Sequence, residues 1–290
     1  NILKKAISKS SPDFIVHMAA QPLVRESYLN PKYTYEVNTL GTINVLNILK
    51  ELNFIKSALI VTTDKVYFNN NKKKYFKEND LLGGADPYSN SKSCAELAVD
   101  SYYHSFFRKK KIYIATARAG NVIGGGDFSK DRIIPDYFRS LLKNQKLILR
   151  SPNSIRPWQH VLDPLYGYLI LLMKLHNKQI VSGNHFNFGP NNSSNKSVNE
   201  VIHLMNKYFQ NSVEVIKKKA VPETIKTRNH KESKVLMLNS NKSKKILKWS
   251  SKYNLEESLS LTSAWFKQYI DKKNRNILEV TQDQIRKYFN

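Results

Sequence analysis

Cysteine is almost absent from this sequence, which has a single cysteine, Cys94, among 290 residues. One cysteine cannot form a disulfide within the chain, so the fold must be stabilised by its core. Long apolar runs are absent too, because the longest, YGYLILLMKL at 166–175, is shorter than the roughly 20 residues that a membrane-spanning helix needs. No signal peptide is visible. These absences predict a cytoplasmic protein with no membrane partner, in which residues 166–175 form a buried helix.

Acidic residues are also few. The chain has 23 Asp and Glu against 47 Lys and Arg, a formal charge of +24, which can attract nucleic acid, an acidic surface or an anionic substrate. The lysines, however, are spread over the whole chain, and the sequence lacks zinc-finger spacing, an RNA-recognition aromatic signature and a recognisable reading helix. We therefore expect solvated lysines and no nucleic-acid partner. A basic nucleic-acid binder stays as an alternative, for which only a sequence preference would count.

Apolar segments alternate between strand-like and helix-like patterns. Short buried strands are predicted at DFIVHMAA (13–20), KSALIVTTD (56–64) and IYIATARAGNVIG (112–124). Helices are predicted over residues 31–52 and from the stretch DPYSNSKSCAEL to about residue 107. Repeated strand–helix–strand units predict an α/β fold in which helices cover both faces of a doubly wound parallel sheet.

The pattern loosens after about residue 125, where loops rich in Pro, Asn and Gly separate shorter elements. We expect a cofactor-binding domain over residues 1–120 and a smaller, mainly substrate-binding region over residues 121–290. Residues 155–190 are expected to return to the first domain.

Candidate catalytic residues lie where predicted strands end, the edge at which parallel sheets bind ligands. Tyr88 and Lys92 are four positions apart, so they share one helix face. A nearby ammonium stabilises a phenolate, which lowers the pKa of tyrosine from about 10. Thr63, Asp64 and Lys65 follow the strand just before them. A solvated helix face and a solvated turn are the simpler alternatives, but the combination favours one catalytic device.

These residues belong to motifs of a known family. The runs TTDKVY, LLGGADPYSNSK, RAGNVIGGGD and RPWQHVLDPL, with HMAAQPLVRESY and VNTLGTINVL, resemble the extended short-chain dehydrogenase/reductase family of nucleotide-sugar epimerases and dehydratases. Within it they most resemble the 4,6-dehydratases that act on CDP-glucose. Lysine at position 65, where related dehydratases carry glutamate, is a feature of that branch. The resemblance extends to about residue 249 and implies a Rossmann-like cofactor domain.

The resemblance implies a redox-neutral dehydration that converts CDP-glucose to CDP-4-keto-6-deoxyglucose, for deoxysugar and O-antigen polysaccharide synthesis. Tightly bound NAD would take a hydride from C4 while Tyr88 removes the O4 proton. Lys92 would hold Tyr88 ionised and bind the nicotinamide ribose, and Thr63 would bond the O4 region. Lys65 would act on the C5 proton while neutral, and Asp64, protonated, would deliver a proton to the departing C6 hydroxyl.

Further binding residues are implied by the same motifs, and no metal site is. Arg132, Arg156 and His160 have equally plausible structural roles, as surface ion pairs or a core side chain. The expected cofactor-binding residues are Ala19, Ala20, Gln21, Asn38, Tyr88 and Lys92, and the expected substrate-binding residues are Asn121, Arg132, Arg156 and His160.

The sequence departs from the family at its start. The family begins with a strand and a GxxGxxG turn that binds the NAD pyrophosphate, and no such motif precedes residue 14. We therefore expect a shortened chain with exposed strand edges, and an inactive fragment is one alternative to an enzyme. Another NAD-dependent nucleotide-sugar epimerase or dehydratase is the nearest alternative. A homodimer is expected through the helices at 31–52 and 89–107.

Overall fold

The structure divides into two compact units. The computed structural model describes residues 2–71, 74–110, 112–179, 182–209, 213–217, 233–271 and 276–290. Unit 1 consists of Asn1–Ala119, Tyr166–Phe188 and Leu238–Ser250, and unit 2 of Gly120–Leu165, Gly189–Met237 and Ser251–Asn290. Of the segment expected to return to the first domain, 166–188 lies in unit 1 and 155–165 in unit 2. Residues 238–250 also belong to unit 1, which the sequence did not suggest.

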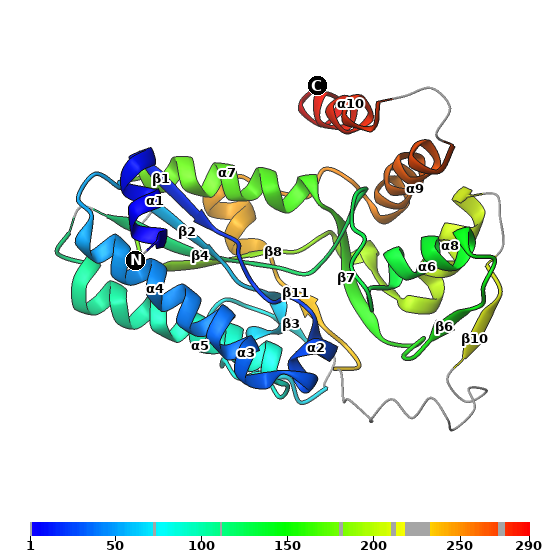
Figure 1. Cartoon of the computed structure of the whole chain (residues 1–290), viewed down its shortest axis with the longest axis horizontal. Coiled ribbons are helices and arrows are strands. Elements are labelled where there is room, and N and C mark those ends of the chain that lie inside the picture. Colours follow the sequence, from blue (N-terminus) through cyan, green and yellow to red (C-terminus); the bar gives the residue numbers. More distant parts are fainter. Residues whose placement is uncertain are drawn as a thin grey trace. The chain divides into compact units, whose positions relative to one another are not determined.

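Unit 1 is built on a four-stranded parallel sheet (Figure 1). Its strands are β1 (Phe14–His17), β2 (Ser57–Val61), β4 (Tyr113–Ala119) and β8 (Asn184–Phe188), in the order β1-β2-β4-β8. The register pairs Phe14 with Ser57 and Ser57 with Tyr113, so the carboxyl ends of the strands lie at one edge. This sheet confirms the predicted α/β class.

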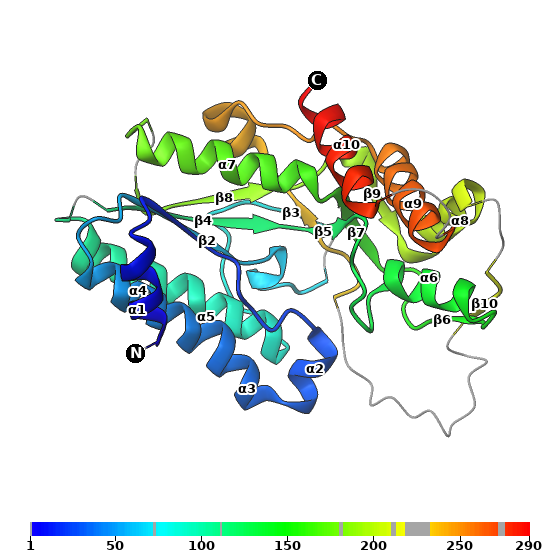
Figure 2. The ribbon, with the colours of Figure 1, turned by 45° about the horizontal axis from the view of Figure 1, so that its top comes forward.

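Helices cover both faces of this sheet. The helices α4 (Gly41–Glu51) and α5 (Pro87–Tyr102) lie on one face and α7 (Leu162–His176) on the other, as Figures 1 and 2 both show. Leu46 and Leu49 of α4 pack with Ile60 of β2 and Val99 of α5 in one buried cluster. The 3.6-residue spacing of apolar side chains on α4 and the β-branched run of β2 direct these residues into the same core.

The predicted helical segments divide into several pieces. The expected helix at 31–52 is α3 (Pro31–Tyr35), a π-helical turn η1 (Glu36–Leu40) and α4, and the helix at 86–107 is α5 followed by the π-helical turn η3 (Tyr103–Phe107). Residues 166–175 are helical as expected, although Leu169 and Met173 are exposed. The remaining short elements of unit 1 are α1 (Ile2–Ser10), α2 (Val24–Leu29), η2 (Asp64–Val66), β3 (Tyr75–Phe76) and η7 (Ser243–Leu247).

The strand expected at 112–124 is two strands. β4 ends at Ala119 in unit 1, and β5 (Asn121–Ile123) belongs to unit 2. Gly120 stands between them, against Pro157: a Cβ at Gly120 would lie 2.5 Å from Pro157 Cγ. A larger residue would collide with Pro157, so glycine is required at the point where the chain passes from unit 1 to unit 2.

Unit 2 contains two small sheets and four helices among its described residues. β7 (Ile155–His160) pairs with β5 on one side and with β9 (Asn195–Ser197) on the other. The other elements are β6 (Leu147–Leu149), which pairs with β10 (Val215–Lys217), the 3₁₀ turn η4 (Asn192–Ser194), α6 (Ile133–Leu142), α8 (Val198–Phe209), α9 (Leu255–Asp271) and α10 (Ile277–Phe289). The short strand β11 (Met237–Leu238) lies where the chain passes from unit 2 to unit 1.

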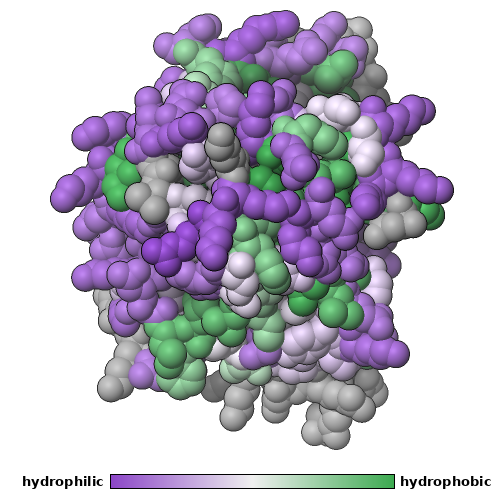
Figure 3. Space-filling view, turned by 90° about the vertical axis from the view of Figure 1, so that its left-hand side faces the viewer, coloured by the Kyte–Doolittle hydropathy of each residue, from purple (hydrophilic) through white to green (hydrophobic). Residues whose placement is uncertain are grey.

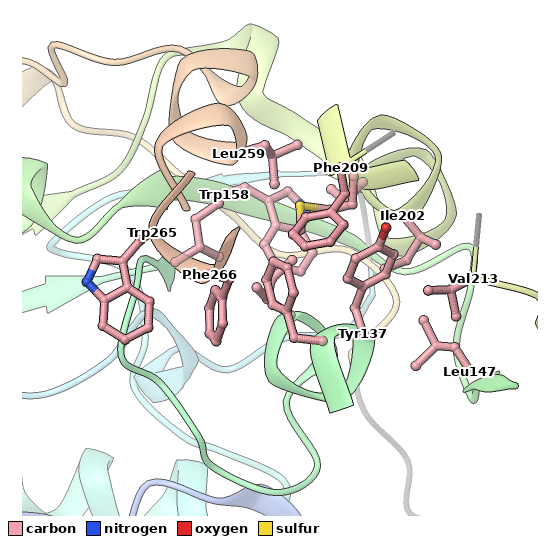
Figure 4. Close-up of a cluster of buried hydrophobic side chains, with 14 of the residues drawn as sticks. Tyr137, Leu147, Trp158, Ile202, Phe209, Val213, Leu259, Trp265 and Phe266 are labelled. Carbon is pink, nitrogen blue, oxygen red and sulfur yellow. The ribbon is translucent and has the colours of Figure 1, made fainter. Parts of the chain in front are cut away.

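An aromatic core holds unit 2 together (Figure 4). Phe138 of α6 stacks on Phe266 of α9 with ring centroids 3.8 Å apart, and it meets Phe209 of α8 edge-on at 5.3 Å. Trp158 of β7 is buried in the same cluster. These rings join three helices to the sheet, so unit 2 has a core of its own.

One face of the molecule carries mostly hydrophilic side chains. On the face shown in Figure 3, hydrophilic residues predominate and hydrophobic ones form small patches between them. Among the described residues, no helix combines the length and the apolar character that a membrane crossing requires.

Candidate active site

Polar side chains follow β2 at the carboxyl edge of the sheet. Thr63 caps the 3₁₀ turn η2, because its hydroxyl oxygen accepts a bond from the Lys65 amide at 3.4 Å. The same hydroxyl donates to Asp64 Oδ1 at 3.1 Å. Thr63 and Asp64 are buried and Lys65 is partly exposed. The sequence thus ends a buried strand with a capped turn that carries a carboxyl group and an amine.

The helix α5 brings a phenol and an ammonium to the same edge. Asp86 caps it by accepting a bond from the Ser89 amide at 2.9 Å, and Pro87 occupies the first helical position. Tyr88 and Lys92, one turn apart, are both buried, with 8% and 5% of their surfaces exposed. Lys92 Nζ donates to the carbonyl oxygen of Val61, the last residue of β2, at 3.2 Å.

Three further contacts bring the turn and the helix together. The Ser93 hydroxyl of α5 donates to the carbonyl oxygen of Val66 at 2.8 Å, so α5 packs against η2. Tyr168 of α7 lies near both Asp64 and Tyr88: burial, with the negative charges of those two groups, raises the pKa of Tyr168. Residues 63–65 and Tyr88 therefore lie in one neighbourhood, as the sequence predicted, and Tyr168 adds a second phenol there.

The charges at this site favour a reactive tyrosine. Burial lowers the pKa of Lys92 to about 8, against the opposing effect of the Glu96 carboxylate. Burial and, secondly, the Lys92 charge lower the pKa of His17 to about 4, so the imidazole at the end of β1 is neutral at pH 7. A protonated Lys92 one helical turn from Tyr88 stabilises the phenolate, which suits Tyr88 to remove a proton.

The loop after β1 is attached to α5 through Asn38. The backbone amide of Gln21 donates to Asn38 Oδ1 at 2.8 Å. Asn38 Nδ2 donates to the backbone carbonyl oxygen of Gln21 at 3.1 Å and to the Ser91 hydroxyl at 2.9 Å. These bonds occupy the polar atoms of Asn38, so it positions the loop. Ala19 is exposed and Ala20 is half-buried.

This neighbourhood suits the nicotinamide half of a dinucleotide. Two alanines leave the backbone of the loop accessible, and the Lys92 ammonium supplies donors for ribose hydroxyls at the strand ends, where such folds bind nucleotides. The residues present therefore fit NAD at this half of the cofactor. The assignment of Ala19, Ala20, Gln21 and Asn38 to cofactor binding remains a prediction.

The expected substrate-binding residues lie in unit 2. Asn121 begins β5. Arg156 of β7 is buried, and its Nη1 donates to the Ile155 carbonyl oxygen at 2.9 Å. Arg132, just before α6, forms a partly exposed ion pair with Asp127 at 2.9 Å, which matches the structural alternative for this residue. How these residues lie relative to Tyr88 stays a prediction.

His160 ends β7 and is 1% exposed. Its Nδ1 accepts a bond from the Leu162 amide at 3.4 Å, so the proton of the neutral ring lies on Nε2. Burial lowers the pKa of His160 to about 4, and the ring meets Tyr253 edge-on at 5.6 Å. The imidazole is therefore neutral and fixed, and its predicted role in substrate binding is untested.

A cavity of about 780 Å³ lies elsewhere in unit 1. Tyr113 and Asn184, the first residues of β4 and β8, line it together with Arg108, Lys110 and Lys178. These are the amino ends of the strands, at the edge opposite the Tyr88 neighbourhood. Among the described residues no group of three His, Cys, Asp or Glu side chains is placed to hold a metal ion.

Three important side chains were not predicted from the sequence. Glu96 is fully buried one helical turn after Lys92, and it pairs with Arg118 of β4 and His185 of β8. The spacing Tyr88–Lys92–Glu96, four residues at each step, was the signal for Glu96. Nothing local indicated its two partners, which come from distant parts of the chain.

Comparison with known proteins identifies the family. The profile of the family described as GDP-mannose 4,6 dehydratase matches residues 1–262. The CDP-glucose 4,6-dehydratase of Salmonella typhimurium is 37% identical over 99% of this chain and 79% of that protein. The dTDP-D-glucose 4,6-dehydratase of mouse is 26% identical over 88% of this chain and 68% of that protein.

Solved structures share the fold. The dTDP-glucose 4,6-dehydratase of Bacillus anthracis, solved with NAD, has a TM-score of 0.75 at 24% identity and covers 92% of this chain and 76% of its own. The UDP-glucose 4-epimerase of Thermotoga maritima, solved with UDP-glucose, has a TM-score of 0.79 at 20% identity, with 93% and 82% covered. With the family profile and the Salmonella relative, this chain belongs to the GDP-mannose 4,6-dehydratase family of NAD-dependent nucleotide-sugar epimerases and dehydratases.

Proposed function

We propose that this chain is a CDP-glucose 4,6-dehydratase, which removes water from CDP-glucose to give CDP-4-keto-6-deoxyglucose. The observation that carries the proposal is the 37% identity to the Salmonella enzyme over 99% of the chain. Its support in the structure is the meeting of Tyr88 and Lys92 with the buried turn that holds Thr63 and Asp64. The cofactor is NAD, which accepts a hydride from C4 of the sugar and returns it to C6.

Tyr88 removes the proton from the O4 hydroxyl when C4 is oxidised. Its phenolate is stabilised by the Lys92 ammonium, which lies on the same face of α5 and is held at the end of β2 by Val61. Lys92 also donates to the ribose of the cofactor. Thr63, on the turn beside them, binds the O4 oxygen and positions it for Tyr88.

Asp64 and Lys65 carry out the elimination. A ketone at C4 acidifies the C5 proton, so an amine can remove it, and Lys65 is the amine on the turn. Asp64 protonates the departing C6 hydroxyl. It is the acid of the same turn and its side chain is buried. Adjacent residues on one turn can serve the neighbouring carbons C5 and C6 of one sugar.

The nucleotide and the assembly belong to the same proposal. Asn121, Arg132, Arg156 and His160 of unit 2 bind the CDP-sugar, with the two guanidinium groups as partners for the diphosphate.

The chain forms a homodimer through α4 and α5, whose exposed apolar side chains include Leu97. Sedimentation at micromolar concentration, compared between the chain and Leu97→Glu, tests the dimer: the substitution should yield monomers.

Isotope transfer tests the proposed reaction. CDP-glucose with deuterium at C4 should yield a 4-keto-6-deoxy product with deuterium at C6, because the same hydride returns. In a second reaction, with unlabelled CDP-glucose in D2O, solvent deuterium should appear at C5. Proton NMR of the product reads both positions. dTDP-glucose and UDP-glucose serve as competing substrates at equal concentration.

Three outcomes decide the proposal. Turnover of CDP-glucose with internal deuterium transfer and a preference over the other two sugars supports it. Formation of CDP-galactose without loss of water would instead make the chain an epimerase. Retention of NAD binding, followed by tryptophan fluorescence, without turnover of any of the three sugars would contradict the assigned reaction.

A further inference from the structure

A buried carboxylate with several hydrogen bonds, that of Glu96, lies one helical turn after Lys92 on α5. Glu96 Oε1 accepts bonds from the Thr62 hydroxyl and from Arg118 Nε, the latter at 2.9 Å. Glu96 Oε2 accepts bonds from Arg118 Nη2 at 3.0 Å and from the Thr116 hydroxyl at 2.7 Å. His185 Nδ1 lies 3.2 Å from Oε2. Three elements of the fold thus converge on one carboxylate.

His185 extends this network to a second carboxylate. Its Nε2 lies 3.2 Å from Asp100 Oδ1, one helical turn after Glu96 on α5. The two acids outweigh the burial of the ring and the repulsion by Arg118, so the pKa of His185 is raised to about 9. At neutral pH the imidazole is therefore cationic, and part of the Glu96 charge is neutralised by it.

Glu96 is connected to both halves of the catalytic site. Through α5 it lies one turn from Lys92 and two turns from Tyr88. Through its bond from Thr62 it holds the residue that precedes Thr63. The Thr62–Glu96 bond and the bond from Lys92 to Val61 together attach the end of β2 to two successive turns of α5.

Among the described residues, the titratable groups near Lys92 include the Glu96 carboxylate and the Tyr88 phenol on α5. They also include the imidazole of His17 on β1, which is neutral at pH 7. Glu96 in turn faces Arg118 of β4 and His185 of β8. Arg118 keeps its charge across the pH range of enzymes, so His185 is the partner of Glu96 that can titrate.

We propose that Glu96 is the positioning residue of the catalytic pair: its carboxylate fixes the Thr62 turn against α5 and balances the Lys92 ammonium, and His185 sets how much of that negative charge Lys92 experiences. The inference deepens the proposed dehydration and rests on the roles given there to Tyr88 and Lys92. Glu96 touches neither substrate nor cofactor in this scheme, so it acts through Lys92 and Thr62.

Two substitutions should shift the titration of Lys92 in opposite directions, because they remove charges of opposite sign. Glu96→Gln removes the negative charge that favours the Lys92 ammonium, so Lys92 should lose its proton at a lower pH. His185→Gln removes a positive charge but keeps an amide that can bond Glu96 and Thr116, so Lys92 should hold its proton to a higher pH. A single charge at this range shifts a partly buried group by roughly one pH unit.

The titration of Lys92 can be measured without catalysis. The chain is labelled with [6-¹³C]lysine, the Lys92 signal is identified by its loss in Lys92→Arg, and its shift is followed from pH 6 to 11 by NMR. The expected midpoint moves down in Glu96→Gln and up in His185→Gln. The alkaline limb of the pH profile for CDP-glucose turnover should move in the same two directions.

Thr116→Val is the matched control, because it removes a hydrogen bond to Glu96 but no charge. It should lower stability and leave the Lys92 midpoint in place. If Glu96→Gln is too unstable to study because Arg118 loses its partner, His185→Gln is sufficient as the test. It should perturb the fold less, because the His185 side chain is 18% exposed. An unmoved Lys92 midpoint in His185→Gln would overturn the inference. A moved midpoint without CDP-glucose turnover would instead count against the proposed reaction alone.

Discussion

Tyr88 owes its position to its neighbours in the sequence. It lies two residues after the Asp86 cap, in the first turn of α5, and Lys92 follows one turn later on the same face. This part of the site could be predicted, because helix geometry fixes which residues share a face over four positions. The same spacing pointed to Glu96. Its partners Arg118 and His185, and the position of Tyr168, depend on distant parts of the chain that no local pattern encodes.

The phenol of Tyr88 is expected to be essential for turnover and dispensable for folding. Tyr88→Phe should lower kcat by about 10² to 10⁴-fold, the usual loss when a positioned proton-transfer group is removed, and should leave the circular dichroism spectrum unchanged. Tyr35→Phe is the control, because it deletes a phenol that bonds Asn90 of the same helix at 2.8 Å. Equal activity of the two variants would contradict the assigned role of Tyr88.

At the scale of single elements, helices were better predicted than strands. Residues 31–51 and 87–107 are helical within one or two residues of expectation, because their apolar periodicity extends over several turns. The strand expected at 112–124 was wrong as a single element. Gly120 belongs to the apolar run by composition, and only the folded structure shows that β4 ends before it and that β5 belongs to another unit.

The cap of α5 should affect stability and catalysis together. Asp86 accepts bonds from the Ser89 amide at 2.9 Å and the Ser89 hydroxyl at 2.6 Å, and Tyr88 stands in the turn that it closes. Asp86→Ala should cost about 1 kcal/mol of unfolding free energy in urea and lower kcat as the first turn frays. Asp86→Asn keeps a capping oxygen and should retain most of both. If Asp86→Asn lost as much stability as Asp86→Ala, the capping role would be contradicted.

At the scale of the whole molecule, three histidines, His160 (buried) and His17 and His185 (partly buried), shape how stability depends on pH. His185 has its pKa raised from 6.5 to about 9, so its contribution is complete below pH 6.5 and is lost as pH rises toward 9. His17 and His160 have theirs lowered from 6.5 to about 4, so their contributions are lost as pH falls through that range. The pKa of Lys92 is lowered from 10.5 to about 8, so its contribution to the free energy of unfolding rises with pH only above pH 8, where it opposes the loss from His185.

The free energy of unfolding should therefore be highest near pH 6.5, decline toward pH 8 and decline more steeply toward pH 4. Glu96 adds to the acid decline, because Arg118 and His185 hold its pKa well below the usual value against burial. Urea unfolding at intervals of pH measures the curve. His185→Gln should flatten the decline between pH 6.5 and 8 and make the acid decline shallower, because Arg118 alone then holds down the pKa of Glu96. A decline between pH 6.5 and 8 that persists in this variant would assign it to other groups.

The sequence by itself determined the parallel α/β class, the spacing of Tyr88 and Lys92 and the polar turn after β2, because each depends on periodicity or adjacency over a few residues. Only the tertiary structure decided that Glu96 meets Arg118 and His185, 22 and 89 positions away, and that residues 166–188 and 238–250 join unit 1. These contacts form when β4 and β8 pair side by side in the sheet. Hydrophobic patterning selects the buried face of each element, but not the distant element that will pack against it.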